Sequence, residues 1–180
     1  MGFTMEKDVR KKLDFIFGRR SIRVFLPGEV TDEQVKIMLE AAMAAPSAVA
    51  KDPWRFVVIR NKETLRKIAD VLPNGKMLAD AAVGIAVCGD IEAAHDRQLS
   101  YLLQDCSAAI ENLLLAAHIL GLGACWLGVH PRENRIAALK KILNLPENII
   151  PVSVIAIGKP GEIKEPRTRY DENKVHYEKW

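Results

Sequence analysis

The sequence predicts a single domain of the α+β class over residues 1–180. Two observations indicate this class. Apolar residues recur at helical spacing in several segments of ten residues or more, and three shorter runs between them are apolar and rich in β-branched residues. A chain of 180 residues is also long enough to bury one sizeable core, which favours one domain over several.

The first half of the chain predicts helices on either side of one strand. Apolar residues at helical spacing mark residues 6–17 as an amphipathic helix. A second helix begins at Thr31, which fits a capping box, and stops at Pro46. The run WRFVVI at 54–59 is aromatic and β-branched and predicts a strand, and Asn61 caps the helix that follows it.

The second half predicts two more strands and two helices. Residues 82–88 and 152–157 form apolar runs typical of buried strands. The longest helix, over 97–120, is apolar nearly all round towards its end, so we expect it to be buried within one chain or between subunits. Another helix covers 132–143. Eleven of the 22 residues in 159–180 are charged, so this tail either covers another surface or is disordered.

Composition and charge exclude several classes of protein. The net charge of +3 is too small to indicate a nucleic-acid-binding protein. The N-terminus carries charges where a secretory signal needs an apolar core. Gly121 and Gly123 interrupt the uncharged run 113–129, which we expect to be buried rather than to span a membrane. The three cysteines lack a CxxC spacing and lie in apolar stretches. We therefore expect a cytoplasmic protein with buried, reduced thiols and without nucleic-acid or membrane partners.

A cluster of arginines follows the first predicted helix, in the stretch GRRSIRVF. Arg19, Ser21 and Arg23 alternate with apolar residues that are expected to anchor in the core, so the three polar side chains would project from one side. A fork of arginine donors with a hydroxyl suits a phosphate. Arg167 and Arg169 repeat the same spacing in the tail. Two such forks could hold one phosphate; the alternative is that the cluster only places cations at a helix C-terminus.

Other familiar site patterns are incomplete. The chain lacks a P-loop, and the run GLGACW carries Trp126 where a dinucleotide fingerprint needs its third glycine. A resident dinucleotide site is therefore not expected. The four histidines lack the spacing of metal ligands, and His118 lies on an apolar helix, where a buried core histidine is the simpler interpretation.

Four motifs in the same order resemble those of the FMN-dependent nitroreductases, and the resemblance runs from about Phe15 to Tyr177. The motifs are RRSIR at 19–23, APSA at 45–48 followed by PWRF at 53–56, GLGACWLG at 121–128, and GKP at 158–160 followed by PRTR at 166–169. The sequence departs from the family at two places. Ala50 stands where the family usually has Asn, and Asp52 stands where it usually has Gln before Pro-Trp.

The resemblance implies a fold and a cofactor site. The fold is a central, mostly antiparallel sheet flanked by helices, with residues 159–180 forming an arm that is exchanged in a homodimer. The FMN phosphate would be held by arginines of the two forks and by Ser21, Arg23 would reach the pyrimidine edge of the ring, and the backbone N–H of Gly128 would face flavin N5. Residues 46–48 would come from the partner subunit. The implied flavin-binding residues are Arg19, Arg20, Ser21, Arg23, Pro46, Ser47, Ala48, Ala50, Asn74, Lys76, Leu127, Gly128, Arg167 and Arg169.

The resemblance also implies an activity. NADH or NADPH would deliver a hydride to the flavin and leave, and a nitroaromatic, a quinone or a similar small molecule would accept the electrons. This chemistry requires no protein acid or base, so no catalytic residue is assigned. Ala50 and Asp52 leave open other flavin reactions on the same fold, such as reductive dehalogenation or flavin breakdown. A flavin-binding protein without turnover and a modest nucleic-acid binder are the alternatives from other classes.

Overall fold

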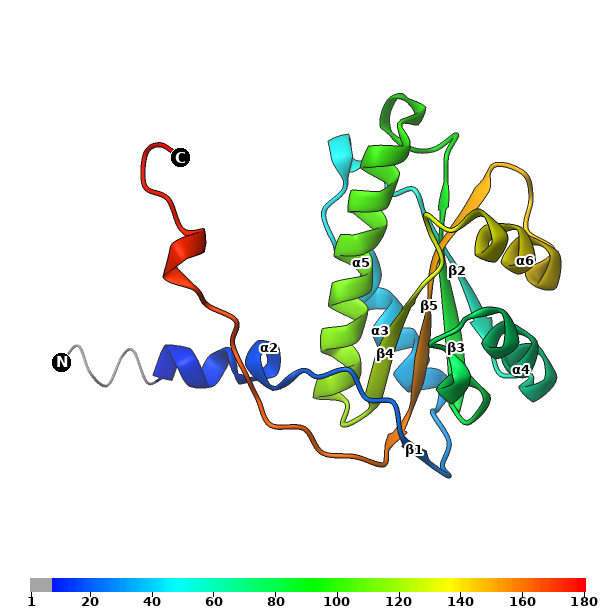
Figure 1. Ribbon diagram of the computed structural model, residues 1–180, viewed down its shortest axis with the longest axis horizontal. Helices are drawn as coiled ribbons and strands as arrows, with labels where there is room; N and C mark the ends of the chain where they lie inside the picture. The colour runs from blue at the N-terminus through cyan, green and yellow to red at the C-terminus, as the bar shows by residue number, and fades with distance from the viewer. Residues whose placement is uncertain (1–7) are drawn as a thin grey trace.

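The structure is a computed structural model that describes residues 8–180. Within these residues the chain forms a five-stranded sheet with helices on both faces, and the two ends of the chain extend away from this body (Figure 1). The sheet and helices confirm the predicted α+β class. The exchange of the C-terminal arm between subunits stays a prediction.

The sheet is organised around its longest strand, β5 (Ile149–Pro160). On one side β5 pairs with β3 (Val83–Asp90), which in turn pairs with the edge strand β2 (Trp54–Ile59). On its other side β5 pairs with β4 (Gly123–Gly128), and its end pairs with the short β1 (Phe25–Leu26). These four ladders are all antiparallel. β2 has the predicted bounds, whereas β4 was predicted only as a buried segment after a glycine turn.

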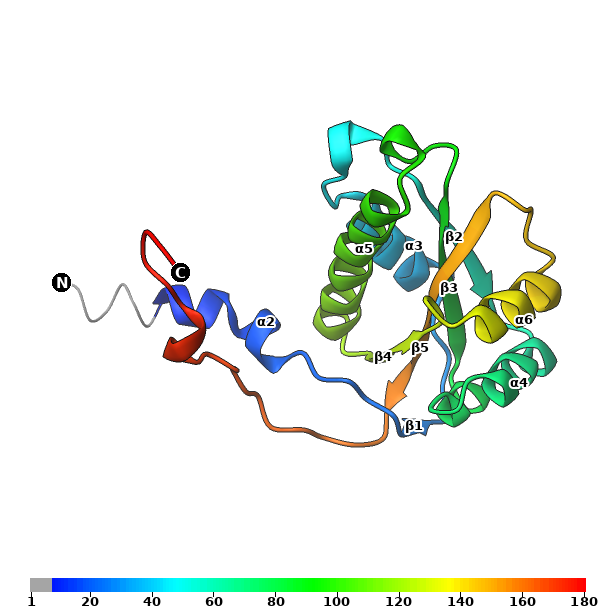
Figure 2. The ribbon, with the colours of Figure 1, turned by 45° about the horizontal axis from the view of Figure 1, so that its top comes forward.

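Two layers of helices cover the sheet (Figures 1 and 2). One face carries α3 (Asp32–Met43) and α5 (Leu99–Ile119), and the other carries α4 (Lys62–Val71) and α6 (Glu133–Leu143). The side chains of β3 alternate between the two layers. Val83, Ile85 and Val87 join the core with α3 and α5, while Ala86 and Cys88 join the core with α4 and α6. β3 is therefore buried on both faces, as its apolar sequence predicts.

The helix ends confirm the capping signals. The hydroxyl of Thr31 accepts a hydrogen bond from the backbone N–H of Gln34 at 3.1 Å, and the side chain of Gln34 accepts one from the N–H of Thr31 at 3.0 Å. The side chain of Asn61 accepts a bond from the N–H of Thr64 at 2.9 Å. Each bond joins residues three apart, so the local sequence is sufficient to specify it.

The N-terminal helix differs from its prediction. Residues 8–12 are helical, Leu13 interrupts the helix, and α2 continues over Asp14–Gly18; residues 6 and 7 lie outside the described part. The apolar face exists but is open to solvent, with Val9, Phe15 and Ile16 between 36% and 50% exposed. The helix projects from the body, so no surface within residues 8–180 covers that face (Figure 1).

The tail after β5 is extended and exposed. It contains a single short turn over Glu172–Lys174, and it runs back beside α2, where the backbone N–H of Arg167 donates to the carbonyl of Phe17 at 3.3 Å (Figure 2). Large side chains along it are also exposed, including Ile163, Tyr170, Tyr177 and Trp180. The prediction that this segment cannot bury a core of its own is confirmed.

Two further expectations concern burial. Cys88, Cys106 and Cys125 are buried and unpaired, as expected. Val24, predicted to be a core anchor, is 51% exposed, because it lies at the margin of the sheet where only the start of the tail pairs with it. No helix within residues 8–180 combines the length and the apolar character needed to cross a bilayer.

Gly89 provides a test of the packing between β3 and α5. A Cβ added to Gly89 would overlap the side chain of the fully buried Leu102. We expect Gly89→Ala to lower the free energy of unfolding by about 1–3 kcal/mol, because a packed core must shift to accept the methyl group. Urea denaturation measures the effect. The matched control is Gly128→Ala on β4, where an added Cβ meets no atom within 4 Å and stability should be unchanged. Equal stability of the two variants would contradict this packing.

Candidate functional site

The arginine-rich stretch lies along β4. Ser21 forms a parallel bridge with Ala124, and the backbone N–H of Ile22 donates to the carbonyl of Ala124 at 3.0 Å. The side chain of Ile22 is 9% exposed and packs against Gly123. A Cβ on Gly123 would come within 2.8 Å of the Ile22 side chain, so this glycine permits the close approach. The stretch is thereby fixed at the margin of the sheet, as the alternation of polar and apolar residues predicts.

The stretch does not direct its three arginines to one place. Arg19 and Arg20 line a cavity of about 260 Å³ at the end of α5, which we call the α5-end hollow. Arg23 lines a second cavity of about 190 Å³ beside Gly128, which we call the Gly128 hollow. Arg19 and Arg23 thus line different cavities, because the stretch runs past β4 from one cavity to the other.

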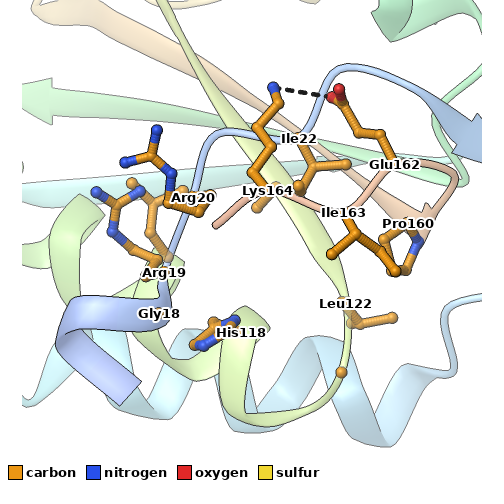
Figure 3. A pocket seen from close by; sticks show the side chains of 13 residues that line it. Gly18, Arg19, Arg20, Ile22, His118, Leu122, Pro160, Glu162, Ile163 and Lys164 are labelled. Carbon is orange, nitrogen blue, oxygen red and sulfur yellow. Dashed lines mark ion pairs between the residues drawn. The ribbon is translucent and has the colours of Figure 1, made fainter. Parts of the chain in front are cut away.

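The α5-end hollow is rich in nitrogen-bearing side chains. Figure 3 shows Arg19, Arg20, Lys164 and His118 around it, with Glu162 as its one lining carboxylate. His118 was expected to be a buried core residue, but it is half-buried and lines this hollow because α5 ends here. A cavity of this composition suits an anionic group.

The two arginines of this hollow differ in their partners. The Nε of Arg19 lies 3.1 Å from a carboxylate oxygen of Glu111 on α5. The Nε of Arg20 is buried and has no hydrogen-bond partner within residues 8–180. A buried donor without a partner is costly, so a bound acceptor at this position would stabilise the fold.

Two residues at the start of the tail clamp the stretch. The backbone N–H of Arg23 donates to Glu162 at 2.6 Å, and the Nζ of Lys164 donates to the carbonyl of Ser21 at 2.7 Å. Lys164 and Glu162 also form an ion pair at 3.0 Å. The N–H of Arg23, followed by Lys164, lowers the pKa of Glu162. Neither residue was predicted from the sequence, since nothing in a charged tail separates them from its other charges.

The Gly128 hollow brings together four of the predicted flavin-binding residues, Arg23, Asn74, Leu127 and Gly128. A Cβ on Gly128 would meet no atom within 4 Å, so open space lies in front of its backbone. Arg135 on α6 completes the lining, and its Nη1 donates to the carbonyl of Gly128 at 2.9 Å. The described residues that line this hollow include two arginines and no carboxylate.

Lys76 and the two tail arginines lie outside both linings. Lys76 opens a short 3-10 turn two residues after Asn74 and is exposed. Arg167 and Arg169 are exposed in the tail. The bond from the Arg167 N–H to Phe17 nevertheless brings the tail within two residues of Arg19, although the two segments are far apart in sequence.

The loop at 46–52 lies away from both hollows. It sits beside the start of α5, whereas the α5-end hollow lies at the other end of that helix (Figure 1). The predicted residues Pro46, Ser47, Ala48 and Ala50 therefore do not meet the others within one chain.

Hydrogen bonds hold this loop in a constrained conformation. Val49, Ala50 and Asp52 have φ values of 52°, 52° and 49°, in the left-handed region that residues other than glycine seldom adopt. The hydroxyl of Ser47 donates to the carboxylate of Asp52 at 2.5 Å and accepts from the N–H of Asp52 at 3.0 Å. Asp105, which is 5% exposed on α5, accepts the N–H of Ala48 at 2.9 Å. The two bonds between Ser47 and Asp52 brace the loop internally, and the bond from Ala48 to Asp105 attaches it to α5.

The described residues show no grouped metal ligands, and burial raises the pKa of all three cysteine thiols. Residues 8–180 contain no group of three His, Cys, Asp or Glu side chains arranged to hold a metal. Burial raises the pKa of the Cys88 and Cys106 thiols to about 12, so neither provides a thiolate at neutral pH.

Comparison with known proteins identifies the family. A family model described as "Nitroreductase family" matches residues 16–75 and 71–159. The chain belongs to the nitroreductase family. It is similar to a protein from Methanothermobacter thermautotrophicus that is provisionally named an NADH dehydrogenase/NAD(P)H nitroreductase. The two are 46% identical over 168 residues, which cover 93% of this chain and 87% of the relative.

Solved structures of nitroreductases share the fold. A provisionally named NADH dehydrogenase/NAD(P)H nitroreductase from Bacteroides thetaiotaomicron superposes with a TM-score of 0.88 at 43% identity, covering 94% of this chain and 98% of that one. A nitroreductase from Desulfovibrio desulfuricans, also provisionally named and solved in complex with FMN, gives a TM-score of 0.80 at 33% identity, covering 93% and 96%. The nitroreductase fold is thus established for this chain.

The clamp of this nitroreductase can be tested by pH. The pKa of Glu162 is lowered in the folded state, so its stabilising effect is complete above the unfolded value near 4.5 and is lost as the pH falls through the lower, folded value. We expect Glu162→Gln to reduce the free energy of unfolding at pH 7, and the difference from the unmodified protein to shrink as the pH approaches 3. Urea denaturation across this range measures it. Glu165→Gln, an exposed neighbour in the tail, is the control. A difference that does not vary with pH would contradict the clamp.

Proposed function

We propose that this nitroreductase is an FMN-dependent NAD(P)H oxidoreductase that reduces nitroaromatics, quinones or similar small acceptors. The Gly128 hollow carries the proposal. Four residues that the family resemblance implies for the flavin, Arg23, Asn74, Leu127 and Gly128, come from three separate segments and line one cavity.

The residues that line the two hollows fit both ends of FMN, the ring and the phosphate. A planar ring needs open space against a backbone, and the space in front of Gly128 is open. A phosphate needs several donors, and the α5-end hollow contains Arg19, Arg20 and Lys164, with the Nε of Arg20 unpartnered among the described residues. The stretch from Arg19 to Arg23 connects the two cavities, so one ligand lying along it would have its phosphate near Arg19 and its ring near Arg23.

The tail supports the phosphate assignment. The bond between the Arg167 N–H and Phe17 brings the second arginine fork near the first, and Ser21 lies on the stretch between the two cavities. Arg19 is paired with Glu111 in this structure. We propose that a bound phosphate competes with the carboxylate of Glu111 for Arg19. Phosphate is favoured in this competition because it carries more negative charge than a carboxylate.

The chemistry follows from the cofactor. FMN when bound would supply hydride transfer between NAD(P)H and the acceptor. Arg23 would place a positive charge at the ring and thereby favour the state of the flavin that carries negative charge. Gly128 would leave room for the ring, and Leu127 would exclude water from its edge.

A second subunit would complete the site. Pro46, Ser47, Ala48 and Ala50 line neither hollow within one chain, yet hydrogen bonds hold their loop rigidly to α5. Apolar side chains on α2 and the tail are also exposed, and no surface in the described part of the chain covers them. We therefore propose a homodimer in which each loop contributes to the partner's flavin site.

An anaerobic titration tests the proposed function. The purified protein, reconstituted with FMN, should show a bound-flavin spectrum that NADH or NADPH bleaches in the absence of air. A nitroaromatic or a quinone should then restore the colour. Bound flavin that neither nicotinamide reduces would favour a flavin-binding protein without turnover. A protein that binds no FMN would overturn the proposal.

Substitution of the arginine forks tests the phosphate site. We expect Arg19→Ala and Arg167→Ala each to weaken FMN binding about tenfold or more, because a charge-assisted bond to a phosphate contributes roughly 1.5–3 kcal/mol. Riboflavin, which lacks the phosphate, should be affected far less. Fluorescence titration with both flavins measures the effect, and Arg66→Ala on α4 is the control. Equal losses for FMN and riboflavin would contradict the assignment.

The proposed homodimer can be tested by its mass in solution and by a substitution on α2. Sedimentation at micromolar concentration should give about twice the 20.1 kDa of one chain. Ile16→Asp should weaken the association, because a carboxylate would replace an exposed apolar side chain of α2 that the partner is expected to cover. The exposed Asp14→Asn is the matched control. A monomer that still binds FMN would contradict the composite site.

A further inference from the structure

Arg135 is a second cation in the Gly128 hollow, and the family motifs do not assign it a role. It is the third residue of α6, it is half-buried, and it lines the same cavity as Arg23. Its guanidinium is held in place, since Nη1 donates to the carbonyl of Gly128 at 2.9 Å. The two arginines come from different elements, and they share a cavity without a lining carboxylate to neutralise them.

Helix stability does not explain this arginine. The first turn of a helix carries partial positive charge, so a cation there is unfavourable. Glu133, at the start of the same turn, has the charge that the helix end prefers. A neutral side chain with an N–H group would also suffice to bond the Gly128 carbonyl. The positive charge of Arg135 therefore points to a ligand in the hollow rather than to the fold.

We propose that Arg135 is a second ring-side cation that stabilises negative charge on the flavin and so favours its reduced form over its oxidised form. This inference rests on the proposed function, because it needs FMN in the Gly128 hollow. The Gly128 carbonyl positions the guanidinium beside the open space in front of the Gly128 backbone. Arg135 then acts together with Arg23, which lines the same hollow from a different segment of the chain.

Two substitutions separate charge from hydrogen bonding. Arg135→Gln keeps an N–H donor for the Gly128 carbonyl but removes the charge, whereas Arg135→Lys keeps the charge. The control is Arg132→Gln, which removes a charge from an exposed position beside α6 that does not line the hollow. Solvent and salt screen such an exposed charge. Arg23→Gln provides a comparison with the cation that the motifs assign.

The measurement is redox potentiometry of the FMN-loaded proteins, with the affinity for oxidised FMN measured in parallel. We expect R135Q to lower the ratio of the affinities for reduced and oxidised flavin about tenfold. For a two-electron couple, this change is a fall of about 30 mV in midpoint potential. R135K should stay close to the unmodified protein, and R132Q should not differ from it. If R135Q does not fold, R135M carries the same expectation.

The outcomes are distinct. A bound flavin whose midpoint is unchanged in R135Q overturns the inference and leaves the proposed function intact. Equal shifts in R135Q and R135K also overturn it, because they would show that geometry rather than charge is responsible. An unmodified protein that binds no FMN overturns the proposed function, and this inference with it.

Discussion

Antiparallel pairing along β5 positions most of the candidate site. One edge of β5 bonds to β3 from Val83 to Asp90, and the other bonds to β4 from Gly123 to Gly128. The arginine-rich stretch lies next to β4, and the tail that clamps this stretch continues directly from the end of β5. Because antiparallel ladders fix the register of both strands, Gly123 lies opposite Gly158, near the start of the tail, and Gly128 lies opposite Ser153 at the other end of the ladder.

Electrostatics explains how three arginines within five positions are accommodated. Like charges at this spacing repel one another, yet Arg20 and Arg23 line different cavities, which separates their charges. Arg19 has Glu111 as a partner. Glu162 accepts the backbone N–H of Arg23 rather than binding its guanidinium, so the clamp orders the stretch while that charge stays available to a ligand.

The conformation of the loop at 46–52 explains how Ala50 and Asp52 are accommodated where the family usually has Asn and Gln. Position 50, where the family usually has Asn, has a φ of 52°. Asn adopts this region more readily than Ala, so Ala50 adds strain that other contacts must offset. Asp52 supplies one such contact through its two bonds with Ser47, and Asp105 supplies another through Ala48. A carboxylate at position 52 therefore acts in this chain as a brace within the loop.

Features that depend on neighbouring residues could be predicted from the amino-acid sequence alone. The caps at Thr31 and Asn61 and the bounds of β2 follow from side chains a few positions apart. The family motifs also indicated Arg23, Leu127 and Gly128, which the fold then gathers in one cavity. These features were predictable because each is encoded in a short, continuous stretch.

Contacts between residues that are far apart in sequence became apparent only in the folded chain. Glu162 and Lys164 bond to the stretch across 139 and 143 positions, and Arg135 reaches Gly128 from a separate helix. His118 lines a cavity because α5 ends beside the tail, although its apolar helix suggested a place in the core. The pattern of α2 was recognised, but its exposure was not, since periodicity defines an apolar face and says nothing about the surface that covers it. Contacts of this kind depend on how the whole chain closes around β5, and no local pattern carries that information.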